Sequence, residues 1–171
     1  MKNLLDKVHA GLADVLGSEL GMLSPNLEKM CGSPIEVALG LSILLYDRIC
    51  PTPWSPLILA KQGDEERHYG LDTRLLIPQY QLDDKRIDFL LREDSLRVFI
   101  ECDGHDFHER TKKQAANDRR RDREIQQSGA HILRFTGSEI WSDPIECASQ
   151  VFDFVSDQRM HQYLSRQSAA E

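Results

Sequence analysis

The segment LRVFIECDGHDFHER (residues 96–110) joins an apolar run to a group of acids and histidines. Its first five residues are typical of a buried strand, and Glu101 falls where that strand leaves its apolar run. A buried carboxylate without a partner would be costly. We therefore expect Glu101 to have a function or a partner, and Asp103, His105 and His108 are the nearest residues that could act with it.

Strand alternation separates the side chains of this segment into two groups. Val98, Ile100 and Cys102 share one face of the predicted strand. Glu101 and Asp103 share the opposite face. Cys102 is therefore not expected to join the two acids through its side chain.

The run KRIDFLLR (residues 85–92) predicts a neighbouring strand with a third acid. Ile87 and Phe89 share one face and Asp88 the other. If the two strands pair as a hairpin, Asp88 lies on the face of Glu101. Three converging carboxylates would repel one another, and a divalent cation removes that conflict. Oxygen ligands with room for water and phosphate are typical of a Mg²⁺ site.

Two helices are predicted before these strands. Apolar residues at helical spacing predict a helix over residues 3–22, closed by Gly21 and Pro25. A second helix begins after Ser33, a favourable N-cap, and Glu36 completes a capping box. Its middle is apolar on nearly every face, so we expect it to be buried.

The rest of the chain predicts an α/β fold. Residues 51–70 contain three prolines and two glycines and are expected to form an irregular connection. The polar run 108–128 predicts a helix that ends at Gly129, and Asp143 is the expected N-cap of a last helix. The predicted strands are residues 73–82, 85–92, 96–103 and 131–135. This order gives a mixed β-sheet flanked by helices, with a helical crossover before the last strand.

The charge is strongly polarised along the chain. The formal net charge is −7, but residues 110–123 carry +5, which leaves −12 for the remainder. Such a basic segment is a candidate docking face for a polyanion. No apolar run approaches the 18 residues of a membrane span, the first residues lack the features of a signal peptide, and no CxxC pair occurs. We therefore expect a cytoplasmic protein that does not contact membranes.

Several stretches together resemble a known family: SPIE, RIDF, ECDGHDFH, DRRRDREIQQSGAHILRF and TGSEIW. They resemble the PD-(D/E)xK nuclease superfamily, and most closely its very-short-patch-repair-like branch. The resemblance runs from about Ser33 to Trp141. It implies a restriction-endonuclease-like domain over residues 33–171, with residues 1–32 as an N-terminal helical extension.

The resemblance also implies roles for the acids. Asp88 and Glu101 would bind Mg²⁺, for which Mn²⁺ would substitute, and Glu36 would be a more distant ligand or an orienting group. Where the superfamily has a lysine two residues after the glutamate, this chain has Asp103. Asp103 is a further candidate metal ligand, but it cannot supply the positive charge of that lysine.

Histidine chemistry would then replace the missing lysine. His108 is the expected catalytic base, with His105 as the alternative. Lys112 or Lys113 would be another source of the missing charge.

The implied activity is metal-assisted hydrolysis of phosphodiester bonds in DNA, duplex DNA above all. Arg134 either points into the same site or forms a structural ion pair with one of the acids, and the sequence leaves both open. The residues expected to contact nucleic acid are Lys112, Lys113, Arg119, Arg120, Arg123 and Arg134.

Two other functions stay open at this point. Asp103 would also suit a nuclease fold whose chemistry has lapsed and which only binds nucleic acid. The basic segment would alternatively bind an acidic protein surface, that of a second copy included, and the N-terminal helix is a candidate dimer contact.

Overall fold

The computed structural model describes residues 2–50, 55–64, 74–103, 125 and 129–168, with the side chains of residues 2–6 and 8–13 excepted. The described helices are α1 (Lys2–Met30), α2 (Pro34–Ile49), α4 (Gly137–Ser142) and α5 (Pro144–Ser168). The described strands are β1 (Leu57–Leu59), β2 (Arg74–Leu82), β3 (Lys85–Glu93), β4 (Leu96–Asp103) and β5 (His131–Thr136).

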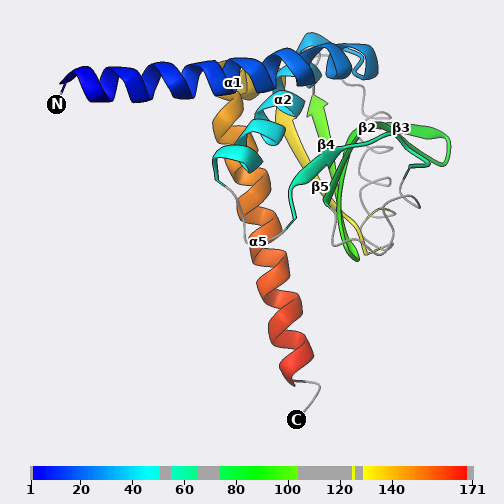
Figure 1. Cartoon of the computed structure of the whole chain (residues 1–171). Coiled ribbons are helices and arrows are strands. Elements are labelled where there is room, and N and C mark those ends of the chain that lie inside the picture. Colours follow the sequence, from blue (N-terminus) through cyan, green and yellow to red (C-terminus); the bar gives the residue numbers. More distant parts are fainter. Residues whose placement is uncertain (1, 51–54, 65–73, 104–124, 126–128, 169–171) are drawn as a thin grey trace.

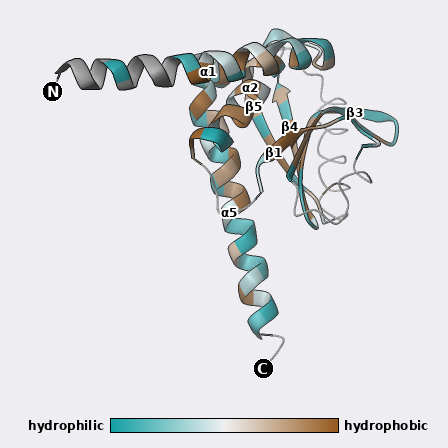
Figure 2. Cartoon of the chain, viewed as in Figure 1, coloured by the Kyte–Doolittle hydropathy of each residue, from teal (hydrophilic) through white to brown (hydrophobic). Residues whose placement is uncertain are grey.

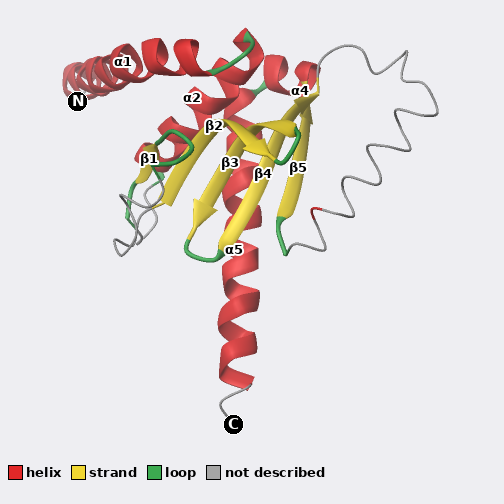
Figure 3. Cartoon of the chain, turned by 90° about the vertical axis from the view of Figure 1, so that its right-hand side faces the viewer, coloured by secondary structure: helices red, strands yellow, loops and turns green. Residues whose placement is uncertain are grey.

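The strands form one mixed sheet in the order β1-β2-β3-β4-β5 (Figure 3). β2, β3 and β4 pair antiparallel, whereas β1 joins β2 and β5 joins β4 in parallel. The predicted mixed sheet with flanking helices and an extra N-terminal helix is confirmed. A parallel β4–β5 pair needs a crossover connection. The helix predicted there, over residues 108–128, lies outside the described residues except for Ile125.

The main core lies between the sheet and the helices. It contains residues of α1, α2, α4 and α5 together with one face of the sheet. Figure 2 shows apolar residues gathered where α2 and the first half of α5 meet the sheet. A smaller cluster, which includes Phe99 and Ile125, covers the other face. A Cβ on Gly40 of α2 would lie 3.0 Å from the Phe89 ring, so glycine permits the close approach of α2 to the sheet.

The beginning of α2 follows its sequence signals. Ser33 has extended backbone angles, and its hydroxyl accepts the Glu36 N–H while Pro34 occupies the first turn. The Glu36 carboxylate accepts the N–H of Gly32 instead of the N–H of Ser33. The predicted capping box is thus present in a variant form, which extends one residue further back. The predicted burial of this helix is confirmed.

The predicted end of the first helix is wrong. α1 continues through Gly21 and Pro25 to Met30 (Figure 1). An internal proline costs a helix about 3 kcal/mol. The added turns bury Leu27 completely and pack Leu23 on the main core. Burial of one leucine contributes about 1.5–3 kcal/mol, so packing offsets the proline.

The irregular connection predicted for residues 51–70 contains a strand. β1 is three residues long, and its Leu57 is fully buried. A strand this short has no periodicity to detect, because its position depends on the parallel pairing with β2.

A chain of buried charges joins the helices to the sheet. Arg74 of β2 is 2% exposed and pairs with Asp47 of α2 and, at 2.7 Å, with Glu93 of β3. Glu93 also pairs with Arg159 of α5. The second oxygen of Asp47 accepts the N–H of Leu57 at 2.7 Å. Four elements thus meet in one set of ion pairs, and a hydrogen bond joins β1 to it.

Replacement of Arg74 by methionine tests this contact set. The change leaves Asp47 and Glu93 buried without their shared cation, which typically costs about 3–5 kcal/mol. We expect urea denaturation to show a loss of this size. Arg166→Met, at an exposed position of α5, is the control and should shift the free energy of unfolding by about 0.5 kcal/mol or less. Equal effects of the two substitutions would contradict the role given to Arg74.

Candidate active site

Glu101 is held at the end of β4 by an ion pair with β5. The glutamate is 8% exposed, and its register partner is Arg134. Arg134 Nε donates to Glu101 Oε2 at 2.9 Å. The partner expected for this buried acid is therefore a guanidinium on the next strand. Of the two interpretations of Arg134, the ion pair is the one observed, and it places Arg134 beside Glu101.

Asp88 lies where the β3–β4 pairing stops. The ladder runs to Phe89 and Ile100, and one further step places Asp88 opposite Glu101. At this point Asp88 Oδ2 accepts the backbone N–H of Cys102 at 2.7 Å. The Asp88 carboxylate thus accepts a backbone N–H that, in a regular ladder, would donate to a backbone carbonyl of the neighbouring strand.

The predicted alternation along β3 holds for only part of the strand. Phe89 and Leu91 face the main core as expected, but Ile87 lies with Leu90 in the smaller cluster on the other face. The interpretation that Ile87 and Phe89 share a face is wrong. The side-chain pattern shifts by one residue between them, at Asp88. In β4 the expected alternation holds, because Val98, Ile100 and Cys102 all belong to the main core.

Glu36 is fixed by three donors at the start of α2. Its Oε2 accepts the Gly32 N–H and the Gln79 side-chain amide, both at 2.7 Å. Its Oε1 accepts the Ser33 hydroxyl at 2.9 Å. A carboxylate has about four acceptor positions, so one remains, on Oε1. Gln79 was not predicted from the sequence, because its contact joins residues 43 positions apart.

Asp103 is the last residue of β4 and pairs in register with Thr136. It is partly exposed, two residues beyond Glu101 on the strand. Glu36, Asp88, Glu101 and Asp103 carry four formal negative charges, and Arg134 carries one positive charge. The group therefore has a formal charge of −3.

The pKa values of two thiols are raised by nearby acids of this group. Burial first, then Glu36 and Asp88, raise the pKa of Cys31 to about 12. Burial and then Asp88 also raise the pKa of Cys102, with a smaller effect of Glu36. Both acids therefore act on both thiols. This places the beginning of α2, Asp88 of β3 and the end of β4 in one neighbourhood.

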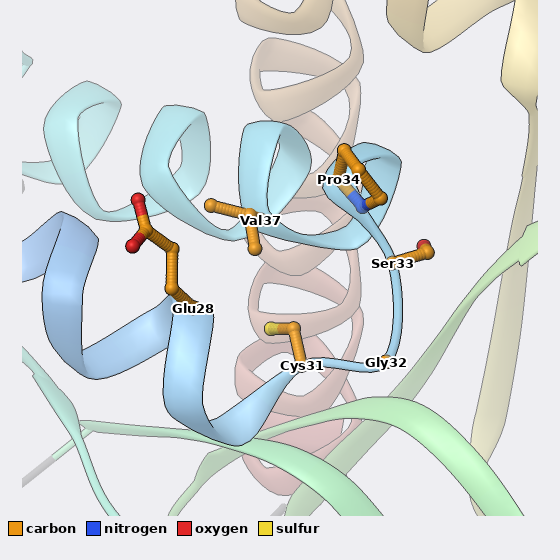
Figure 4. A pocket seen from close by; sticks show the side chains of 6 residues that line it. All are labelled: Glu28, Cys31, Gly32, Ser33, Pro34 and Val37. Carbon is orange, nitrogen blue, oxygen red and sulfur yellow. The ribbon is translucent and has the colours of Figure 1, made fainter.

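A pocket of about 420 Å³ borders this neighbourhood at the turn from α1 to α2 (Figure 4). The turn residue Gly32 forms part of its wall and donates its N–H to Glu36. The residues that line the pocket are Glu28, Cys31, Gly32, Ser33, Pro34 and Val37.

Most of the predicted basic and histidine residues lie outside the described residues. These are His105, His108, Lys112, Lys113, Arg119, Arg120 and Arg123. Their roles stay predictions. Of the residues expected to contact nucleic acid, the structure describes Arg134.

The donor atoms present suit a hard cation better than a soft one. Asp88 and Glu101 offer carboxylate oxygens at adjacent strand positions. Among the described residues, no group of three or more histidine, cysteine or acidic residues is arranged to hold a metal ion by itself. Mg²⁺ is commonly bound by one or two carboxylates and keeps several waters, so Asp88 and Glu101 are ligands of the kind and number that this ion takes.

None of the helices in the described ranges is long and apolar enough to cross a bilayer.

The comparisons with known proteins gave one match. The model of the family REase_MTES_1575 matches residues 70–155, half of the chain. This span includes β2 to β5 and the first half of α5. Searches of curated proteins and of solved structures found no match.

The raised thiol pKa values predict uneven cysteine reactivity. At pH 8 a thiol with a pKa of about 12 is thiolate in roughly one molecule in 10⁴, and the thiolate is the reactive form. Cys50 is exposed and should react rapidly with a chromogenic disulfide reagent, whereas Cys31 and Cys102 should react slowly. Cys50→Ser should remove the fast phase. Denatured wild-type protein should react with four equivalents of the reagent, one for each cysteine. Rapid labelling of Cys102 would contradict the described neighbourhood.

Proposed function

The chain belongs to the restriction-endonuclease-like family REase_MTES_1575, and on this basis we propose that it is a metal-dependent DNA endonuclease. Family membership confirms the restriction-endonuclease-like fold that the sequence resemblance implied. It indicates a nuclease fold and a nucleic-acid substrate in general. The assignment to the very-short-patch-repair-like branch stays a prediction, as does the domain boundary between residues 32 and 33.

The observation that carries the proposal is the placement of Asp88 and Glu101 at one level of the sheet. They occupy opposing positions at the end of the β3–β4 ladder. Each carboxylate is held by a different donor, the Cys102 N–H for Asp88 and Arg134 for Glu101. The two side chains are thus oriented before any ligand binds, as a phosphodiester-cleaving site requires.

Asp88 and Glu101 would hold Mg²⁺ or Mn²⁺, with Asp103 as a further oxygen donor at the partly exposed end of β4. The bound cation would act as a Lewis acid on the phosphate and would lower the pKa of a water. Carboxylates gathered in this way favour a divalent cation, which reduces their mutual repulsion. The cation would also lie between these acids and the negatively charged phosphate.

Glu36 would orient water at this site. Three of its acceptor positions are occupied by Gly32, Ser33 and Gln79, which leaves one for a water. This supports the role of a more distant, orienting group over that of a direct metal ligand. Its three donors hold the carboxylate in one orientation, so the accepted water would be held as well.

Arg134 would supply the positive charge that Asp103 does not. Its guanidinium donates to Glu101 Oε2, and its side chain is one quarter exposed. From this position beside Glu101 it would stabilise the charge that develops on the phosphate. His108 would transfer the proton, and the basic residues between 110 and 123 would hold neighbouring phosphates without reading base sequence.

A second function is favoured by Asp103 itself. An acid where the superfamily has lysine suits a nuclease fold that binds nucleic acid without cleaving it. Such a protein would bind duplex DNA with an affinity that falls as salt rises, because bound phosphates release counterions. It would show that binding in Mg²⁺ with no loss of intact substrate.

Asp88→Asn and Glu101→Gln separate these two functions. Both changes keep the side-chain shape and an acceptor oxygen but remove a charge. We expect the wild-type protein to nick or cut supercoiled plasmid in Mg²⁺ or Mn²⁺, and each variant to lose that activity while circular dichroism stays unchanged.

Asp153→Asn, at an exposed position of α5, is the matched control and should cleave at the wild-type rate. Salt-dependent DNA binding without cleavage by the wild-type protein would support the binding function instead. Protein that neither cuts nor binds DNA would exclude both.

A further inference from the structure

Gln79 occupies an unusual backbone conformation in the middle of β2. Its φ is +53°, a left-handed value that side-chain-bearing residues adopt at a cost. The register pairs Pro78 with Phe89 and Tyr80 with Ile87, so the intervening position of Gln79 lies opposite Asp88. The strain therefore lies beside a proposed metal ligand.

This backbone conformation coincides with a change in the side-chain pattern of β2. Leu75 and Ile77 face the smaller cluster, and so do Tyr80 and Leu82. Strict alternation would have continued to Gln79 and not to Tyr80. The pattern in β2 thus shifts at Gln79, and the pattern in β3 shifts at the opposing Asp88. Strand irregularities beside active sites commonly re-aim side chains in this way.

The side chain of Gln79 reaches across to α2. Its Nε2 donates to Glu36 Oε2 at 2.7 Å. A Cβ built on Gly32 would lie 3.3 Å from Glu36 Oε1 and 3.5 Å from Gln79 Oε1, so the three groups are closely packed. Glycine would adopt the left-handed backbone without strain. The glutamine found here instead has a side-chain amide that donates to Glu36.

We propose that Gln79 is a positioning residue of the nuclease site, which acts through Glu36. This inference rests on the proposed function and adds a residue to it. The left-handed backbone brings the amide to Glu36, and the amide fixes Oε2. The remaining acceptor position on Oε1 is then directed consistently to water at the site. Loss of the amide would leave Glu36 with two donors and a wider range of orientations.

Gln79→Gly removes the amide and relieves the backbone. We expect its cleavage rate in saturating Mg²⁺ to fall about 10- to 100-fold, the usual effect of losing an outer partner of a metal site. Gln79→Asn, which tolerates left-handed φ but is one methylene too short to reach Glu36, should show the same loss. Because the two substitutions affect the backbone differently, the same loss in both would not be explained by a folding defect in one of them.

A double-mutant cycle shows whether the effect passes through Glu36. In the Gln79→Gly background, Glu36→Gln should cost little further rate, because the two side chains act as one unit. Mn²⁺ affinity measured by calorimetry, without substrate, gives a readout independent of cleavage. It should weaken in both Gln79 variants while their thermal midpoints stay within a few degrees of the wild type.

Asp94→Gly is the matched backbone control. Asp94 has a φ of +50° in the turn at the far end of β3, and its glycine variant should cleave at the wild-type rate. Wild-type rates and Mn²⁺ affinities in both Gln79 variants, or losses that add fully with Glu36→Gln, would overturn the inference and leave the nuclease function standing. A wild-type protein without cleavage or Mn²⁺ binding would overturn both.

Discussion

The buried guanidinium of Arg74 is the contact on which the arrangement of helices and strands depends. It lies between carboxylates of α2 and β3, and Glu93 extends the contact to Arg159 of α5. Phe152 of α5 places its ring 5.3 Å from the same guanidinium. Ionic contacts of this kind contribute little net stability over apolar packing, but an incomplete set is very costly. They therefore favour one arrangement of α2 and α5 on the sheet.

The proposed site uses the frame that this contact defines. Glu36 belongs to the same helix as Asp47, and Asp88 belongs to the same strand as Glu93. With both elements fixed, α2 can present Glu36 to β2, and β3 can end its ladder with β4 beside Asp88. The buried ion pairs and the proposed active site thus lie towards opposite ends of α2 and β3. At one end the acids are paired with Arg74 and Arg159, and at the other the described acids are gathered beside Arg134.

The sequence predicted what local patterns encode and missed what distant contacts decide. The strand that contains Glu101 was predicted to its last residue, because its apolar run and alternation are strong. The end of α1 was missed because burial of Leu27 outweighs Pro25, and that burial depends on α2 and the sheet. The opposing positions of Asp88 and Glu101 were predicted because a hairpin determines their pairing. Gln79 and Arg74 were missed because nothing local marks a bend in a strand or a buried cation.

The row formed by Gln79, Asp88, Glu101 and Arg134 has a consequence for how the chain folds. The four residues lie at one level across four neighbouring strands. A slip of one residue in any of these pairings would bring an apolar side chain against a charged one and turn a buried face outward. Misregistered sheets would therefore be less stable than the observed one. The residues of the proposed active site would thus also help to select the correct strand register when the sheet forms.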